Sequence, residues 1–198
     1  MLIRPRPDTP SISIAIQLLN GSDTIAKTGK DGILITLTRA HDGHDQPCIF
    51  YWSGSRDGFA SDGFLLLHRA ADDQLEKIEV SSHDGPRPEA PIKDKISPWD
   101  HHIRELTPGA SDRFYQKIPQ RYRDALVPGE RYELVWAGGE VCWWAWGTIQ
   151  QHEGQPRDYK PPSLVCPGGS YLSFTAIAEQ PLSLRQPSPP PTRSSTRM

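Results

Sequence analysis

Two histidine pairs are the side chains whose type and spacing come closest to a reactive arrangement. His41 and His44 stand three residues apart in the sequence HDGHD, and His101 and His102 are adjacent. Imidazole and carboxylate groups are the usual ligands of zinc and of non-haem iron. One hypothesis is therefore a metal-dependent enzyme or metal-binding protein, in which the His41/His44 loop and either His101 or His102 hold a transition metal such as Zn or Fe.

The same loop also fits a simpler interpretation, which we favour. Asp and Gly between the two histidines are typical of a solvated turn. A jelly-roll oxygenase would carry a His-x-Asp/Glu pair and a distant His, and neither His44-Asp45 nor residues 41–44 have that spacing. We therefore expect no cofactor and keep the metal as the alternative.

Nucleophilic and nucleotide-binding motifs give no better candidate. The sequence has no Gly-x-Ser-x-Gly motif, no Walker loop and no dinucleotide-binding glycine fingerprint. The cysteines are Cys48, Cys142 and Cys166, an odd number without metal spacing, which favours free thiols in a reducing compartment; one disulfide plus one free thiol remains an alternative. We expect Cys142, in an apolar run, to act as a small hydrophobe, and Cys166, near a turn, to be the more exposed thiol.

Tryptophan supports a second functional hypothesis, which is binding through an aromatic surface. Trp52, Trp99 and Trp143 are the candidates for an outward-facing ring that stacks on sugars or on proline-rich peptides. The N-terminus lacks the apolar core of a signal peptide, which argues against a secreted carbohydrate-binding module. We expect a non-catalytic, cytoplasmic interaction module that binds a protein partner or a second copy of itself.

Composition sets limits on these hypotheses. The chain has 198 residues, 36% of them hydrophobic, and 20 prolines, which is enough for one domain with its own core. The formal net charge is −2, so we expect no nucleic-acid partner, and we interpret Arg121, Arg123 and Arg131 as a solvated face. No run approaches the roughly 20 apolar residues of a membrane span, so we expect no membrane association.

The stretch from 126 to 148 holds four of the six tryptophans and organises the predicted fold. Val127-Pro128-Gly129-Glu130 predicts a type II turn, because proline sets φ at its second position and glycine supplies a positive φ at its third. Residues 131–136 then alternate apolar and polar side chains, as in a half-buried strand. Gly138-Gly139 predicts a tight hairpin with a return strand over residues 141–146.

The loop length of that hairpin decides which tryptophans face inward. A two-residue loop pairs Trp136 with Val141, whereas a three-residue loop pairs it with Glu140, and a one-residue slip exchanges the two faces. Both registers stay open. We favour Trp144 and Trp146 inside, with Trp143 on the opposite face.

The sequence LVPGERYEL resembles the Leu-x-Pro-Gly-x-x-Tyr corner of fibronectin type III and other immunoglobulin-like sandwiches. The resemblance implies that the hydroxyl of Tyr132 bonds to backbone near Leu126. Residues 119–148 and 164–176 also resemble a group of uncharacterised fungal proteins, a resemblance that implies no known activity.

The other segments complete an all-β prediction. Strands are expected at residues 11–19, 33–38, 48–52, 63–68, 77–81, 99–106, 113–118 and 170–177, with a helical turn at 119–126 and a loop at 150–162. Pro-Gly precedes a strand three times, at residues 108, 128 and 167. About nine strands favour an antiparallel immunoglobulin-like β-sandwich, and a jelly-roll barrel is the alternative.

The two ends of the chain differ from this pattern. We expect a flexible N-terminal arm at residues 1–7, the β-sandwich domain at 8–179 and a disordered tail at 180–198 that is rich in proline and serine. The PSPPP run at residues 187–191 favours polyproline II, and such segments can dock in aromatic grooves.

Overall fold

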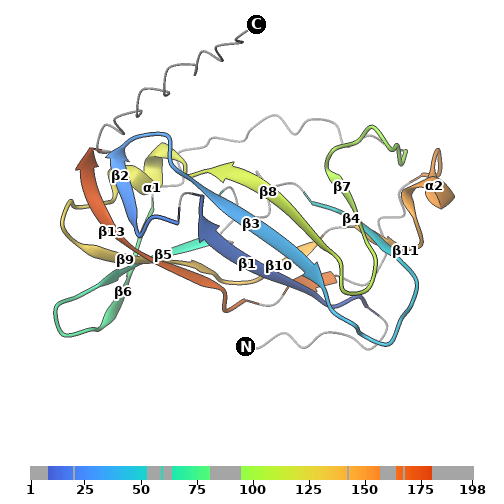
Figure 1. The fold of residues 1–198 in the computed structure, drawn as a ribbon, viewed down its shortest axis with the longest axis horizontal. Coiled ribbons are helices and arrows are strands. Elements are labelled where there is room, and N and C mark those ends of the chain that lie inside the picture. The colour runs from blue at the N-terminus through green and yellow to red at the C-terminus, as the bar shows by residue number, and fades with distance from the viewer. Residues whose placement is uncertain are drawn as a thin grey trace, which may run out of the picture.

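The computed structural model describes residues 9–19, 21–52, 59, 64–80, 95–141, 143–156, 164–166 and 168–179. The predicted arm at 1–7, the predicted tail at 180–198 and Cys142 lie outside the described residues. Within them the protein is mostly β, with thirteen strands and two short helices. The prediction of an all-β class is confirmed at this level (Figure 1).

The largest sheet has five strands in the order β2-β13-β9-β5-β6. These are β2 (Thr24–Thr28), β13 (Tyr171–Glu179), β9 (Arg131–Trp136), β5 (Phe64–Arg69) and β6 (Leu75–Ile78). Strand β2 pairs with β13 in parallel, and the other neighbours are antiparallel. Strand β2 lies between the predicted strands 11–19 and 33–38, where no strand is predicted, because its five residues show little alternation and its partner β13 is far away in sequence.

A second sheet contains β1 (Ile12–Leu18), β3 (Gly32–Arg39) and β8 (Ser111–Lys117), all antiparallel. The alternation of residues 11–19 correctly predicts β1, whose burial switches strictly from residue to residue. The strand predicted at residues 33–38 lies within β3 and pairs with β1, with Ile14 opposite Leu37 and Ile16 opposite Ile35.

One hydrophobic core joins these two sheets. Its buried members include Ile12, Ile14, Ile16, Ile33, Ile35, Leu37, Phe64, Leu66, Tyr132, Leu134, Trp136, Phe174 and Ala176. Each fully buried large apolar side chain stabilises the fold by about 1.5–3 kcal/mol relative to its exposed state. The two sheets therefore stabilise each other mainly through the faces that the period-two pattern assigns to the interior.

Two smaller sheets replace the predicted central hairpin. Strands β10 (Gly139–Val141) and β12 (Leu164–Cys166) pair with each other, whereas β11 (Trp144–Trp146) joins β4 (Cys48–Tyr51) and β7 (Ile103–Leu106) in the order β11-β4-β7. The prediction that residues 141–146 return along residues 131–136 is wrong, and with it both proposed registers.

The edges of β9 explain this outcome. They are occupied by β5 and β13, and at the last residue of the strand the Trp136 N–H donates to Ser170 O at 2.7 Å. Gly138 has a φ of 103°, and a Cβ there would lie 3.1 Å from the backbone N of Gly168. The glycine pair therefore lets the chain pass close to residues 168–169 instead of closing a hairpin.

The tryptophans of this stretch lie on two sides. Trp144 lies in the main core and Trp146 packs half-buried against it. Trp143 belongs to a second cluster with Ile49, Tyr51, Ile96 and Ile103. The predicted separation of Trp143 from Trp144 is confirmed, although the strand partner that produces it is β4.

Both helices are one turn long. Helix α1 (Gln120–Asp124) follows Pro119 as predicted and places Tyr122 in the core, where its hydroxyl donates to Phe64 O at 2.8 Å. Helix α2 (Ile149–His152) lies in a segment predicted as loop, and a capping box between Thr148 and Gln151 begins it.

The Pro-Gly turns form as predicted where they are described. Gly129 has a φ of 93° and the Glu130 N–H donates to Val127 O at 3.2 Å, while Gly109 has a φ of 76°. The Tyr132 hydroxyl accepts a hydrogen bond from the Val127 N–H at 2.9 Å, so the predicted bond to upstream backbone is confirmed. In the described part of the chain, no helix is long and apolar enough to cross a membrane.

Candidate functional site

Three long connections meet at one end of the molecule. The sheet β11-β4-β7 takes β4 from the connection between β3 and β5, β7 from the connection that precedes β8, and β11 from the connection between β9 and β13. Figure 1 shows these strands and α2 together at one end of the long axis, with α1 and the end of β13 at the other. Connections of this kind carry the binding residues in many folds, which makes this end of the molecule the candidate site.

Arg39, the last residue of β3, holds the three connections together. Its side chain is fully buried, and its guanidinium donates to the carbonyls of His44 at 2.8 Å, of Leu106 at 3.2 Å and of Gln46. The same group lies over the ring of Trp146, with Cζ 5.0 Å from the ring centroid. Sequence reasoning missed this residue, although it continues the inward series Ile33, Ile35 and Leu37.

The His41–Asp45 loop is built around that arginine. The carboxylate of Asp42 accepts from the Ser11 N–H at 3.0 Å, from the His44 N–H at 3.2 Å and from Arg39 at 3.3 Å. Burial acts against ionisation of Asp42, but these donors together hold its pKa below the usual range. The ionised carboxylate of Asp42 therefore stabilises the conformation of the loop.

The histidines of both pairs have separate surroundings. The His44 ring packs on Trp146, with 4.7 Å between the ring centroids. His41 instead lies against Gly109, where an added Cβ would be 2.5 Å from Nε2 of His41. The ring centroids of His101 and His102 lie 4.6 Å apart, and the His102 ring also contacts the Tyr51 ring at 5.5 Å between centroids. Among the residues the structure describes, no three His, Cys, Asp or Glu side chains are arranged to hold a metal ion. The His41/His44 loop therefore gains no third ligand within the described part.

Trp99 stands out at the same end, because 85% of its side chain is exposed. It lies in the turn 97–100, which the Asp100 N–H closes by donating to Ser97 O at 3.0 Å, with Pro98 at the second position. The Trp99 N–H donates to Ser97 Oγ at 3.3 Å. The exposed ring is thus carried by a turn whose backbone is held by hydrogen bonds.

A second turn fixes the segment to the sheet. The Ile103 N–H donates to Asp100 O at 2.9 Å, the His102 N–H donates to Asp100 Oδ1 at 3.0 Å, and the Trp52 N–H donates to His102 O at 2.7 Å. We call residues 97–102 the Trp99 turn. Its backbone is anchored both within itself and to the residue after β4.

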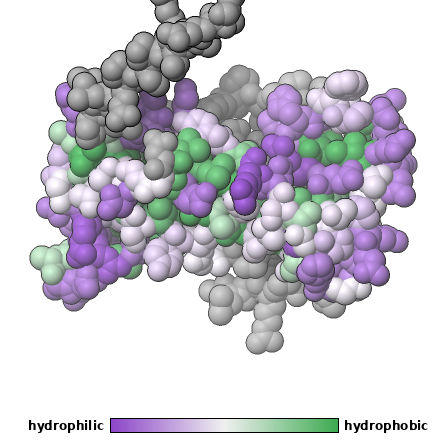
Figure 2. All heavy atoms as spheres, viewed as in Figure 1, coloured by the Kyte–Doolittle hydropathy of each residue, from purple (hydrophilic) through white to green (hydrophobic). Residues whose placement is uncertain are grey.

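The second hydrophobic cluster supports the Trp99 turn from below. Ile96 and Ile103 flank the turn and are buried in this cluster, against which Ala145 and Ile149 pack half-buried. Figure 2 shows hydrophobic residues reaching the surface at this end between hydrophilic ones. The backbone that carries the Trp99 indole is therefore held by packed side chains, which limits the conformational freedom lost on binding.

The other two tryptophan candidates are not at the surface. Trp52 is 2% exposed and packs on Trp136 at 5.9 Å between centroids, and Trp143 is 3% exposed in the second cluster. Burial corrects the expectation that these rings face solvent, because their apolar area is worth more in the core than in water. Of the three candidates, Trp99 remains available to a partner.

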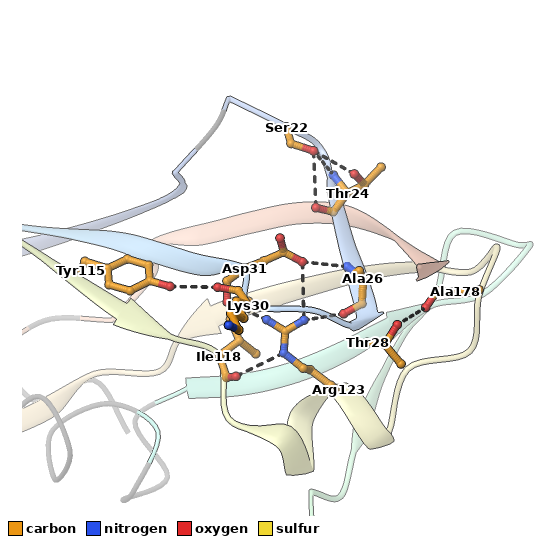
Figure 3. Close-up of polar contacts among 10 residues, drawn as sticks. All are labelled: Ser22, Thr24, Ala26, Thr28, Lys30, Asp31, Tyr115, Ile118, Arg123 and Ala178. Carbon is orange, nitrogen blue, oxygen red and sulfur yellow. Dashed lines mark hydrogen bonds and ion pairs between the residues drawn. The ribbon is translucent and has the colours of Figure 1, made fainter. Parts of the chain in front are cut away.

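The predicted arginine face needs a similar correction at Arg123. Its guanidinium is buried and donates to the carbonyls of Asp31 at 2.6 Å, Ile118 at 3.3 Å and Ala26, with the Asp31 carboxylate 3.5 Å away (Figure 3). Arg123 therefore fastens α1 to the loop between β2 and β3. Arg131 remains largely exposed.

A pocket of about 200 Å³ lies beside that loop. Its lining comes from Leu18, Leu19, Ser22, Thr24, Lys30, Asp31 and Gly32. Figure 3 shows the Ser22 and Thr24 hydroxyls turned toward each other, 2.8 Å apart, and Asp31 bonded to the Ala26 N–H at 3.0 Å. The polar groups of this pocket are thus largely engaged in holding the loop.

The two described thiols are buried. Burial raises the pKa of Cys48 to about 11, despite the nearby Arg39 guanidinium. Cys166 is fully buried in the main core, so the expectation of an exposed thiol there is wrong. Cys48 is a free thiol, and a thiol with such a pKa is a weak nucleophile at neutral pH.

Comparison with known proteins adds no relative to this picture. No protein-family model, no curated protein and no solved structure matches the chain.

Proposed function

We propose that the protein is a non-catalytic interaction module of the cytoplasm, built on an immunoglobulin-like β-sandwich, with Trp99 as the anchor of its binding surface. The strand order supports the fold. The order β1-β3-β8 corresponds to strands A, B and E of such sandwiches, and β13-β9-β5-β6 corresponds to G, F, C and C′. The bond from Val127 N–H to the Tyr132 hydroxyl lies at the start of β9, where the tyrosine corner of strand F belongs.

The position of Trp99 supports the function. In this correspondence β4 lies in the B–C connection and β11 in the F–G connection, and variable domains use these two connections for binding. The analogy concerns the fold alone and gives no ligand. The Trp99 turn belongs to the connection before β8, which β7 joins to the same small sheet.

One observation carries the proposal, and it is the 85% exposure of Trp99 on a hydrogen-bonded turn. Tryptophan is enriched among residues that dominate protein interfaces, because it buries a large rigid area with few rotatable bonds. The nearby polar groups of Arg39 and Asp42 already bond to the backbone of this end. Binding by the indole therefore suits this surface better than proton transfer does.

The free buried thiol of Cys48 supports the cytoplasmic location, since unpaired cysteines are typical of a reducing compartment. A protein partner or a second copy of the chain is the ligand class that suits a rigid exposed indole.

Selection of displayed random peptides on the full chain tests the function. We expect enriched peptides that bind the wild type and lose at least about tenfold in affinity for Trp99→Ala, which corresponds to roughly 1.4 kcal/mol. Tyr171→Ala is the matched control, because this ring is 62% exposed on the five-stranded sheet, and it should leave binding unchanged. If no enriched peptide depends on Trp99, the proposed function is wrong.

A further inference from the structure

We propose that the Trp99 turn binds the proline-rich segment 187–191 of a second copy of this chain. The inference rests on the proposed function and names its partner. It combines an exposed, supported indole with a polyproline sequence in the same polypeptide. Each copy then carries one receiving surface and one ligand, so the two are present in equal amounts wherever the protein is expressed.

The segment 187–191 has the chemistry that an indole recognises. Its sequence is PSPPP, and such a composition favours the polyproline II helix, which has three residues per turn. A polyproline II helix of this sequence would place Pro187 and Pro190 on one face, about 9 Å apart at its rise of 3.1 Å per residue. Proline rings on one face pack against aromatic side chains, and the preformed helix loses little entropy on binding.

The receiving surface offers more than one ring. The exposed His101 and half-buried His102 follow Trp99 in the same turn, and Tyr51 lies behind His102. Exposed aromatic side chains are the surface on which polyproline ligands dock.

Charge favours the same ligand. Arg185 and Arg193 flank the proline run, and no acidic residue occurs between 180 and 198. Next to the Trp99 turn, Glu153 is exposed and precedes Gly154, whose N–H donates to Ile96 O at 2.9 Å. A basic flank of the ligand therefore has an acidic group at the edge of the surface, which favours the encounter.

The geometry of the chain points to a second copy. Strand β13 ends at Glu179, at the end of the long axis opposite β7 and α2 (Figure 1). The seven residues from 180 to 186 span at most about 25 Å when fully extended. Binding between copies avoids stretching this linker along the molecule.

Sedimentation equilibrium of the full chain, from about 5 to about 500 μM, gives the first test. We expect reversible association of the wild type that weakens at least about tenfold in Trp99→Ala and in the double variant Pro187→Ala/Pro190→Ala. Tyr171→Ala and Ser194→Ala/Ser195→Ala are the controls and should associate as the wild type does. A monomeric wild type over this range, which includes the case of an intramolecular contact, would overturn the inference.

Complementation gives a second test that does not depend on any one variant folding perfectly. The Trp99→Ala chain keeps its proline segment, and the proline variant keeps its Trp99. We expect the two variants, labelled with different fluorophores, to bind each other while neither binds itself. If the mixture associates no better than its components, the inference fails. Peptides without proline that still depend on Trp99 would defeat this inference while sustaining the proposed function.

Discussion

The guanidinium of Arg39 lies over the indole of Trp146, with Cζ 5.0 Å from the ring centroid, and the His44 ring packs on the same indole at a tilt, 4.7 Å between centroids. Arg39 ends β3, His44 follows it in the next connection, and Trp146 ends β11. A single buried cation thus joins the last residue of a core strand to the small sheet that carries the Trp99 turn.

Replacement of Arg39 by Met should destabilise the protein strongly. Met fills much of the volume, but the carbonyls of His44 and Leu106 lose their donor and Asp42 loses its cation. Breaking a buried charge pair typically costs about 3–5 kcal/mol in the free energy of unfolding. Urea denaturation measures this cost, and Arg39→Lys should recover only part of it because an ammonium cannot bridge the separate carbonyls. A wild-type midpoint for Arg39→Met would contradict the role assigned to this residue.

Trp146→Ala should also destabilise the protein, by about 3 kcal/mol, at the lower end of the range for large-to-small substitutions because the ring is only half-buried. A double-mutant cycle with Arg39→Met should give a coupling energy of about 0.5–3 kcal/mol, since the two side chains are in contact. Strictly additive effects would show that the contact contributes nothing.

Tyr132→Phe tests the turn that begins β9. The variant keeps the ring, which packs on Phe174 at 5.8 Å between centroids, and removes the acceptor for the Val127 N–H. The expected loss is about 1 kcal/mol, and somewhat more if that N–H stays buried and unpaired. Chemical denaturation of this variant beside Tyr115→Phe, which removes an exposed hydroxyl bonded to Lys30 O, should show the larger loss at Tyr132.

Asp42 should make stability depend on pH in the acid range. Its pKa is lower in the folded state than in the unfolded chain, because its hydrogen bonds outweigh the opposing effect of burial. A carboxyl of this kind contributes stability above its unfolded pKa of about 4, and this contribution is lost as the pH falls through the folded value. Urea midpoints of wild type and Asp42→Asn should therefore differ most at pH 6–7, and the difference should shrink as the pH falls below about 4. A difference that stays constant with pH would show that the ionisation of Asp42 does not contribute to stability.

Trp99→Ala should leave stability within about 0.5 kcal/mol of the wild type, as exposed substitutions do. The matched change Trp52→Ala removes a ring that is 2% exposed and should cost about 3–5 kcal/mol. Thermal and urea unfolding of both variants separates the surface indole from the core indole. A large destabilisation by Trp99→Ala would mean that its ring is part of the packing and would undermine its use as an anchor.

Local sequence determined the features that depend on neighbouring residues. The alternation of residues 11–19 and 131–136 identified β1 and β9 and the inward side of each, because side chains of a strand point to opposite faces with a period of two. The Pro128-Gly129 pair predicted a turn from steric rules that act within one loop. The resemblance of LVPGERYEL to the corner of immunoglobulin-like sandwiches implied the hydrogen bond between Tyr132 and upstream backbone, which forms with Val127.

Tertiary structure decided the features that depend on distant partners. Strand β10 pairs with β12, and β11 pairs with β4. Backbone hydrogen bonds between strands do not depend on which side chains the strands carry, so the local sequence does not specify these partners. Arg39 and Arg123 are buried because carbonyls from several segments converge on each guanidinium, which no composition rule detects. Trp52 and Trp99 are the same residue type, and both stand near polar loops. Packing between the sheets buries Trp52 in the core, whereas a hydrogen-bonded turn holds Trp99 in solvent.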